Sequence, residues 1–163
     1  MIKARLQIEG GDILDTVKGY GLWYLDADER LEAPTKGFEF TSYAEEAGQH
    51  TDAKTVQDSF DYKVKFLVQA KNSDIENANI IIRDFNQRLY TKEADTDVRK
   101  YKQVTFYNDL NRVKIVGYPH PISEATDFWR DKHGNIADAV EIEFTITVTD
   151  PILCDFALTD VSP

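Results

Sequence analysis

The sequence has one cysteine and no long apolar run. Cys154 is the only cysteine among 163 residues, so the chain cannot form an internal disulfide. No apolar run approaches the roughly 20 residues that a membrane-spanning helix needs. The N-terminal run MIKARLQIEG also lacks the apolar stretch of a signal peptide. These absences predict a protein that is made in a cytoplasm and has no membrane partner.

Positive charge is also in short supply. The chain has 19 Lys and Arg residues against 29 Asp and Glu residues, which gives a net charge of −10. General binding to a phosphate backbone needs clusters of Lys and Arg, so we expect no specific nucleic-acid binding. The balance suits a solvated surface, or a passage along which nucleic acid slides without sticking.

The usual signatures of catalysis are missing. There is no GxSxG elbow, no phosphate-binding GxxxxGK[ST] loop and no GxGxxG between a strand and a helix. His50, His120 and His133 fall in three separate predicted loops, without the spacing of a zinc site. The acidic run DADERLEAPTKG lacks the glycine that a calcium loop needs at the right step. We therefore expect no catalytic residue, no metal and no cofactor, although glycosidase carboxylates, whose spacing is set in space, stay open.

The clearest positive signal is alternation of apolar and polar residues. In SFDYKVKFLVQA, the even-numbered residues from 60 to 70 are apolar and the odd-numbered residues are mostly polar. This alternation predicts a strand with one buried face and one solvated face. Similar alternation predicts strands at 2–9 and 140–149, and a pair of strands, YKQVTFYND and RVKIVGYPH, joined at Asp109–Asn111. Such strands are typical of antiparallel sheets with one solvated face.

One helix is predicted over residues 74–89. Ser73 and Glu76 have the S-x-x-E spacing of a capping box, which makes Ser73 the expected N-cap. An apolar stripe then recurs at helical spacing, formed by Ile75, Ala78, Ile82, Phe85 and Leu89. The stripe predicts that the helix packs on a sheet.

The pattern predicts a single domain over 1–163 that is mainly β (α+β), an antiparallel β-sandwich or barrel with one flanking α-helix. Its core is expected over 59–150. Residues 20–58 are predicted to be a long loop or arm, with a short apolar run at 22–25 and a short strand at 37–40. Residues 92–100 are predicted to be a charged linker, and residues 122–129 a strand edge followed by a turn at 131–135.

Aromatic residues mark the ends of the expected arm. Trp23 and Tyr24 precede its polar loop, Phe38 and Phe40 follow that loop, and Trp129 lies beside a predicted turn. Large aromatic side chains are enriched at subunit contacts, so these five residues are candidates for a subunit interface. The simpler alternative is that they fold back onto the core of their own chain.

The order of elements resembles the N-terminal ring-forming domain of siphophage distal tail proteins and, more widely, the phage tail-tube superfamily. The resemblance covers about residues 56–152 and lies in the segments SFDYKVKFLVQA, DIENANIIIRDFNQRLY, KQVTFYND, RVKIVGYP and VEIEFTITVTDP. It implies a homo-oligomeric ring, hexameric in that family, around a DNA channel, with other tail proteins as further partners. It also implies a location in the cytoplasm of a bacterial host during assembly and then in the virion tail. The N-terminal third matches weakly, and only 12 residues follow Pro151, so a second, carbohydrate-binding domain is not expected.

The leading functional hypothesis is therefore a phage or prophage tail structural subunit without catalysis, which forms a ring or a tube. The alternative is a monomeric β-sandwich module that binds a ligand or a carbohydrate. An enzyme with dispersed carboxylates is the third hypothesis. Oligomeric state separates the first hypothesis from the second, because a tail subunit must assemble.

Overall fold

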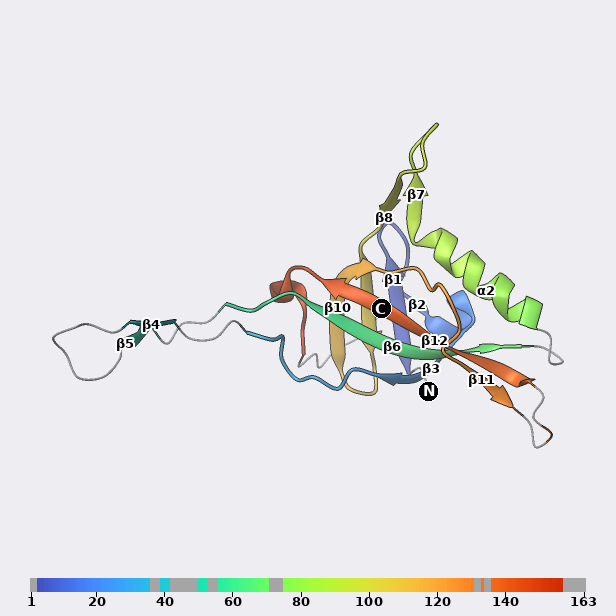
Figure 1. Ribbon diagram of the computed structural model, residues 1–163, viewed down its shortest axis with the longest axis horizontal. Helices are drawn as coiled ribbons and strands as arrows, with labels where there is room; N and C mark the ends of the chain where they lie inside the picture. The colour runs from blue at the N-terminus through green and yellow to red at the C-terminus, as the bar shows by residue number, and fades with distance from the viewer. Residues whose placement is uncertain are drawn as a thin grey trace.

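The computed structural model describes residues 3–35, 39–41, 50–52, 56–70, 75–130, 133 and 136–156. Its body is an eight-stranded antiparallel sheet that curls into a half-barrel (Figure 1). The order along the sheet is β2-β1-β9-β10-β12-β6-β3, and β11 pairs with β12 off this path. The strands are β1 Ala4–Ile8, β2 Leu14–Asp15, β3 Leu22–Ala27, β6 Phe60–Gln69, β9 Val104–Asn108, β10 Val113–Pro119, β11 Asp127–Arg130 and β12 Ile136–Val148.

The centre of the sheet is the pair β6 and β12. They align without interruption from Phe60 opposite Val148 to Gln69 opposite Ala139. In β6 the buried residues alternate strictly with more exposed ones, as the sequence predicts. The 13-residue β12 is long enough to pair with β11 near its start and with β10 near its end. The predicted fold class, mainly β with one flanking helix, is confirmed.

The crossing from β10 to β12 depends on a glycine. A Cβ atom at Gly117 would lie 2.4 Å from the backbone oxygen of Thr147. Real Cβ atoms do not approach a backbone oxygen so closely, so only glycine lets the two strands meet without a backbone shift.

The helix α2, Ile75–Arg88, packs on the inner side of the half-barrel. Its Phe85 ring contacts Phe144 of β12 at 5.3 Å between ring centroids, with the edge of one ring on the face of the other. The amide side chain of Asn86 donates to the carbonyl of Ile122 and accepts from the Ile122 N–H, at 2.8 and 2.9 Å. These contacts hold the helix against the loop before β11. Ser73, the expected N-cap, lies outside the described residues.

Residues 20–58 are not a continuous loop, which corrects the prediction. A short helix, α1 Thr16–Tyr20, leads into β3, which pairs with β6 through Leu22 opposite Val68 and Ala27 opposite Val64. The register shifts between Tyr24 and Asp26, so the alternation of β3 is interrupted in the middle. Because the bulge breaks the two-residue period, the alternation of apolar and polar residues does not predict this strand.

The predicted charged linker at 92–100 is also corrected, because it contains strand residues at both ends. β7 Tyr90–Lys92 pairs with β8 Arg99–Tyr101 as a separate hairpin. Tyr90 and Tyr101 lie opposite each other, with ring centroids 5.6 Å apart. This cross-strand aromatic pair stabilises the hairpin base.

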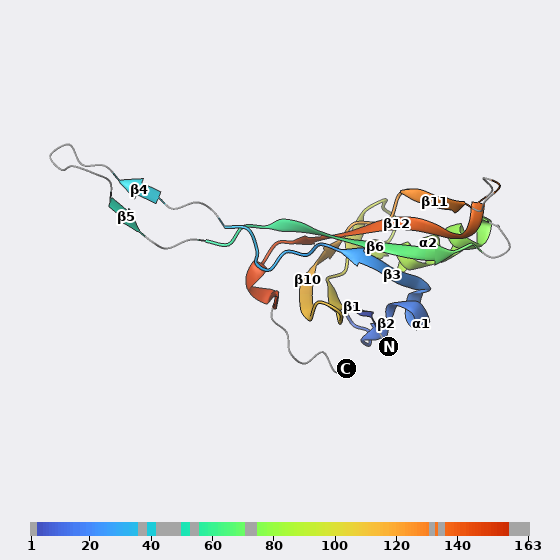
Figure 2. The same cartoon turned by 90° about the horizontal axis from the view of Figure 1, so that it is seen from below.

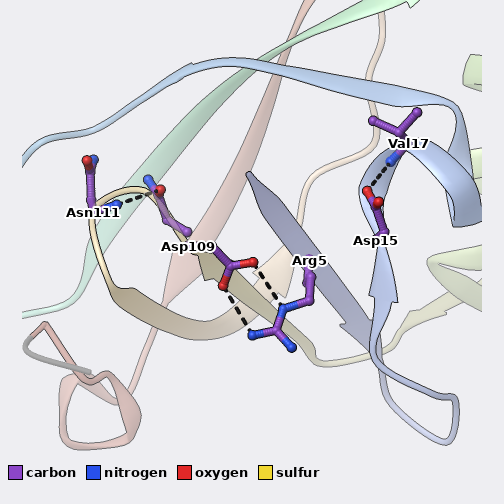
Figure 3. Close-up of polar contacts among 6 residues, drawn as sticks. Arg5, Asp15, Val17, Asp109 and Asn111 are labelled. Carbon is purple, nitrogen blue, oxygen red and sulfur yellow. Dashed lines mark hydrogen bonds and ion pairs between the residues drawn. The ribbon is translucent and has the colours of Figure 1, made fainter. Parts of the chain in front are cut away.

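The two edges of the curled sheet, β2 and β3, do not pair with each other among the described strands, and the edge strand β3 contacts β9 through side chains. Tyr24 of β3 accepts a hydrogen bond from the side chain of Asn108, in β9, at 3.2 Å. Between the neighbouring strands β1 and β9, the Arg5 guanidinium contacts both carboxylate oxygens of Asp109, which follows β9, at 3.1 and 3.2 Å (Figure 3). A cavity of about 140 Å³, lined by residues of β1, β2, α1 and β3, lies between the edges.

Candidate subunit interface

The arm begins where the chain leaves β3 and ends where it enters β6. Its root is closed by an antiparallel bridge between Thr35 and Gln57 and by a hydrogen bond from Asp58 N to Pro34 O. Further out, β4 Glu39–Thr41 pairs with β5 His50–Asp52 and with no other strand of the described chain. Both views place this pair well away from the half-barrel (Figures 1 and 2). An isolated two-stranded sheet is only marginally stable in water, so the arm favours contact with another surface.

The side chains of Trp23 and Tyr24 point to opposite faces of the sheet. Trp23 lies opposite Leu67 on the outer face of the sheet, and 51% of its surface is exposed. Tyr24 points to the inner side, where it packs against the core and bonds Asn108. Trp23 therefore remains available to a partner, whereas the Tyr24 side chain is engaged in its own fold.

Trp129 is the second exposed tryptophan. Its neighbour Phe128 packs against the core opposite Val140, while Trp129 is 45% exposed. Because successive strand residues point to opposite faces, Trp129 points away from the core, toward the face that carries Trp23. Its pairing with β12 is irregular, since the register shifts between Phe128 and Arg130. Phe38 and the side chain of Phe40 lie outside the described residues, although the Phe40 backbone belongs to β4.

The outer face between the two tryptophans carries charges of both signs. Lys63 of β6 pairs with Glu143 of β12 at 3.7 Å, and Lys65 pairs with Glu141 at 3.8 Å. Exposed pairs of this kind contribute little to stability. Their main effect is to leave this face polar and nearly balanced in charge.

The structure describes the side chains of two of the three histidines, His120 and His133. His120 contacts the hydroxyl of Thr147, which donates to Asp61 at 2.7 Å, so the three side chains form a short chain on the outer face. His133 is exposed, and the side chain of His50 lies outside the described residues. Among the described residues, no group of three or more His, Cys, Asp or Glu side chains is placed to hold a metal ion.

The titratable groups with shifted pKa values are buried structural residues. Burial raises the pKa of Tyr62 to about 12, and the nearby Asn108 amide lowers this pKa in part. The Tyr62 hydroxyl has no hydrogen-bond partner of normal geometry, and the Asn108 amide donates to Tyr24. Burial also raises the pKa values of Tyr20 and Tyr24. Burial raises the pKa of the Cys154 thiol, which disfavours the reactive thiolate.

No protein-family model matches this sequence, and no curated protein matches it at a significant level. No described helix combines the length and apolar character that crossing a membrane requires. The sheet, the arm and the exposed tryptophans are therefore the observations on which a function must be argued. Sequence reasoning found the tryptophans, but it assigned Trp23 to a loop instead of a strand.

Proposed function

We propose that the chain is a structural subunit of a phage or prophage tail, forming a ring or a tube around the DNA channel without catalysis. The observation that carries the proposal is the β4–β5 arm, which stands away from the half-barrel and pairs with no other described strand. Such an arm gains stability when it packs on a neighbouring copy. The partners would be further copies of this chain, six in the family that the sequence resembles, and other tail proteins.

Two further features support this proposal. The net charge of −10 disfavours adhesion to DNA, which suits a channel wall. The resemblance of residues 56–152 to tail proteins includes β6, β9, β10 and β12 of the half-barrel and the helix α2, whereas β1, β2 and β3 lie outside it. The corresponding location is the cytoplasm of the bacterial host during assembly, followed by the virion tail.

The experiment is to measure the mass of the purified chain by light scattering across micromolar concentrations and to image it by electron microscopy. We expect rings or tubes. Trp23→Ala should leave the far-ultraviolet circular dichroism spectrum unchanged but should weaken assembly, because an exposed anchor of this kind carries about 2 kcal/mol or more of an interface. Tyr118→Ala, which also removes an exposed aromatic side chain, is the matched control. A chain that stays monomeric at high concentration, alone and with tail partners, would contradict the proposal.

The second candidate function is a monomeric module that binds a ligand or a carbohydrate. It is favoured by one observation, the presence of Trp23 and Trp129 on the same outer face of the sheet. Aromatic faces with polar groups between them suit the stacking of sugar rings. Under this function the chain is monomeric, and Trp129→Ala abolishes binding on a glycan array while the fold is kept.

A further inference from the structure

A polar groove lies on the outer face of the sheet, where β12 runs between β6 and the end of β10. Its volume is about 460 Å³, which is in the range of small-molecule sites. Asp61 and Lys63 line it from β6, and Glu143 and Thr145 line it from β12. The remaining wall is the loop between β10 and β11. Apart from one proline, every lining residue has a polar or charged side chain, so the groove favours a polar ligand.

Hydrogen bonds hold the loop that forms this wall. The backbone N–H groups of His120 and Thr126 donate to carbonyl oxygens of β12 at 2.9 Å each, so β12 fixes both ends of the loop. Between these ends, the two hydrogen bonds of Ile122 with the Asn86 side chain tie the loop to α2. The groove is therefore preformed, and a ligand would lose little free energy to the ordering of its wall.

The imidazole of His120, which lines the groove, is held in one orientation. Its Nε2 atom contacts the Thr147 hydroxyl, and that hydroxyl donates its only proton to Asp61 at 2.7 Å. The Nε2 atom must therefore carry the proton in its contact with Thr147. In the neutral ring, the other nitrogen, Nδ1, is then left as an acceptor for a hydroxyl group of a ligand.

An exposed aromatic side chain borders the groove. Tyr118 of β10 lies opposite Thr147, which lies opposite Asp61, so these residues form a row across three strands. Tyr118 precedes His120 by two residues, and 44% of its surface is exposed. A tyrosine ring combines an apolar face with a polar end. A sugar ring has the matching chemistry, because its C–H face can lie on an aromatic ring while its hydroxyl groups donate and accept hydrogen bonds.

The charges of the groove disfavour anionic ligands. Asp61, Glu124 and Glu143 outnumber the single lysine of the lining, Lys63. The Lys63 ammonium is also paired with Glu143 at 3.7 Å. A phosphate or a carboxylate would therefore meet like charges in the groove. A neutral saccharide meets no such repulsion, and its hydroxyl groups can donate to the carboxylates.

We propose that this groove binds one neutral sugar residue, with the sugar ring against Tyr118 and its hydroxyl groups bonded to His120 and Glu124. Thr147 is a positioning residue, because it acts on the ligand through His120. The site goes beyond the ring-forming function and does not depend on assembly, since one chain supplies all of its residues. It also differs from the tryptophan surface of the second candidate function, because neither tryptophan lines the groove.

The test is isothermal titration calorimetry of the full chain with the methyl glycosides of neutral hexoses, and with glucuronate as the anionic counterpart. At least one neutral glycoside should bind with a dissociation constant of about 1 mM, as expected for a ligand of this size, and glucuronate should bind more weakly. His120→Ala, Tyr118→Ala and Glu124→Ala should each weaken this binding at least about tenfold. All three positions are exposed, so the fold should be kept. Glu93→Ala removes an exposed carboxylate of the β7–β8 hairpin and should bind like the unmodified chain.

Thr147→Val tests the positioning role, because it removes the hydroxyl and keeps the shape of the side chain. It should weaken sugar binding, and the nitrogen-15 chemical shifts of His120 should change from the Nε2-protonated form to a mixture of both neutral forms. The absence of saturable binding by any neutral glycoside would overturn the inference. Binding that persists in His120→Ala and Glu124→Ala but is lost in Trp129→Ala would also overturn it, and would place the sugar on the tryptophan surface. The ring proposal is judged separately, from the mass of the unmodified chain.

Discussion

At the scale of single residues, the most consequential polar contact is the ion pair between Arg5 and Asp109. It joins β1 to the turn after β9, and its side chains are almost fully buried. We expect Asp109→Ala to lower the free energy of unfolding by about 3–5 kcal/mol, because the guanidinium would remain buried without its partner. Denaturant unfolding followed by tryptophan fluorescence measures this loss. Asp97→Ala, which removes an exposed partner of Lys92, should have no measurable effect, and a loss under about 1 kcal/mol for Asp109→Ala would show that solvent reaches Arg5.

Tyr62 gives a second prediction at this scale, one that depends on pH. Its hydroxyl is buried without a hydrogen bond, so Tyr62→Phe should not lower the free energy of unfolding at neutral pH and should raise it by up to about 1 kcal/mol. The pKa of Tyr62 in the folded chain, about 12, lies above the ordinary value of 10.0. The unfolded chain therefore releases this proton first, and the stability that the group contributes below pH 10 is lost as the pH rises toward 12.

The measurement for Tyr62 is a series of denaturant melts between pH 8 and pH 12, a range that spans both pKa values. The alkaline loss of stability should be smaller in Tyr62→Phe than in the unmodified chain. Part of the loss should remain, because burial also raises the pKa values of Tyr20 and Tyr24. An identical pH dependence in both proteins would mean that folding leaves the pKa of Tyr62 at its ordinary value, and therefore that solvent reaches its hydroxyl.

At the scale of elements, the buried side of α2 is the feature that the sequence predicts most directly. Phe85 is buried between Phe144 and Tyr20, so Phe85→Ala should lower the free energy of unfolding by about 3–5 kcal/mol. Ile80→Ala, on the exposed side of the same helix, tests helix propensity without core packing and should change stability by about 0.5 kcal/mol or less. Equal effects of the two substitutions in denaturant melts would contradict the assignment of the inner face.

The elements that the sequence predicts well are those with an uninterrupted period. β6 and β12 alternate strictly and pair over ten positions. The buried side of α2 keeps one apolar stripe over about three turns, from Ala78 to Leu89 just after the helix. β3 was missed because its bulge at Tyr24 to Asp26 breaks the alternation. The β7–β8 hairpin was missed because three-residue strands rich in Lys and Arg carry no apolar period, and only the opposed Tyr90 and Tyr101 hint at pairing.

At the scale of the whole molecule, the groove at the root of the arm, which is lined by Leu31, Val56 and Ile152, could not be predicted from the sequence. Leu31 and Val56 are single apolar residues in polar runs, Ile152 lies far away in the segment PILC, and no spacing rule links positions so far apart. The closing of the arm at Thr35 and Gln57, and the return of the chain after β12, bring them together. The exposed tryptophans were easier to nominate, since their residue type alone suggests an interface.

The arm itself supplies the last prediction. Joining Thr35 to Val56 by a short Gly-Ser linker in place of residues 36–55 keeps both partners of the bridge at the root. It removes β4 and β5, which pair only with each other among the described strands. The thermal midpoint should therefore stay at the value of the full chain, while light scattering should show smaller assemblies, because the arm has lost its surface on a neighbour. A fall in the thermal midpoint without a change in mass would show instead that the arm stabilises the half-barrel of its own chain. The subunit contact would then be assigned to the exposed outer face of the sheet.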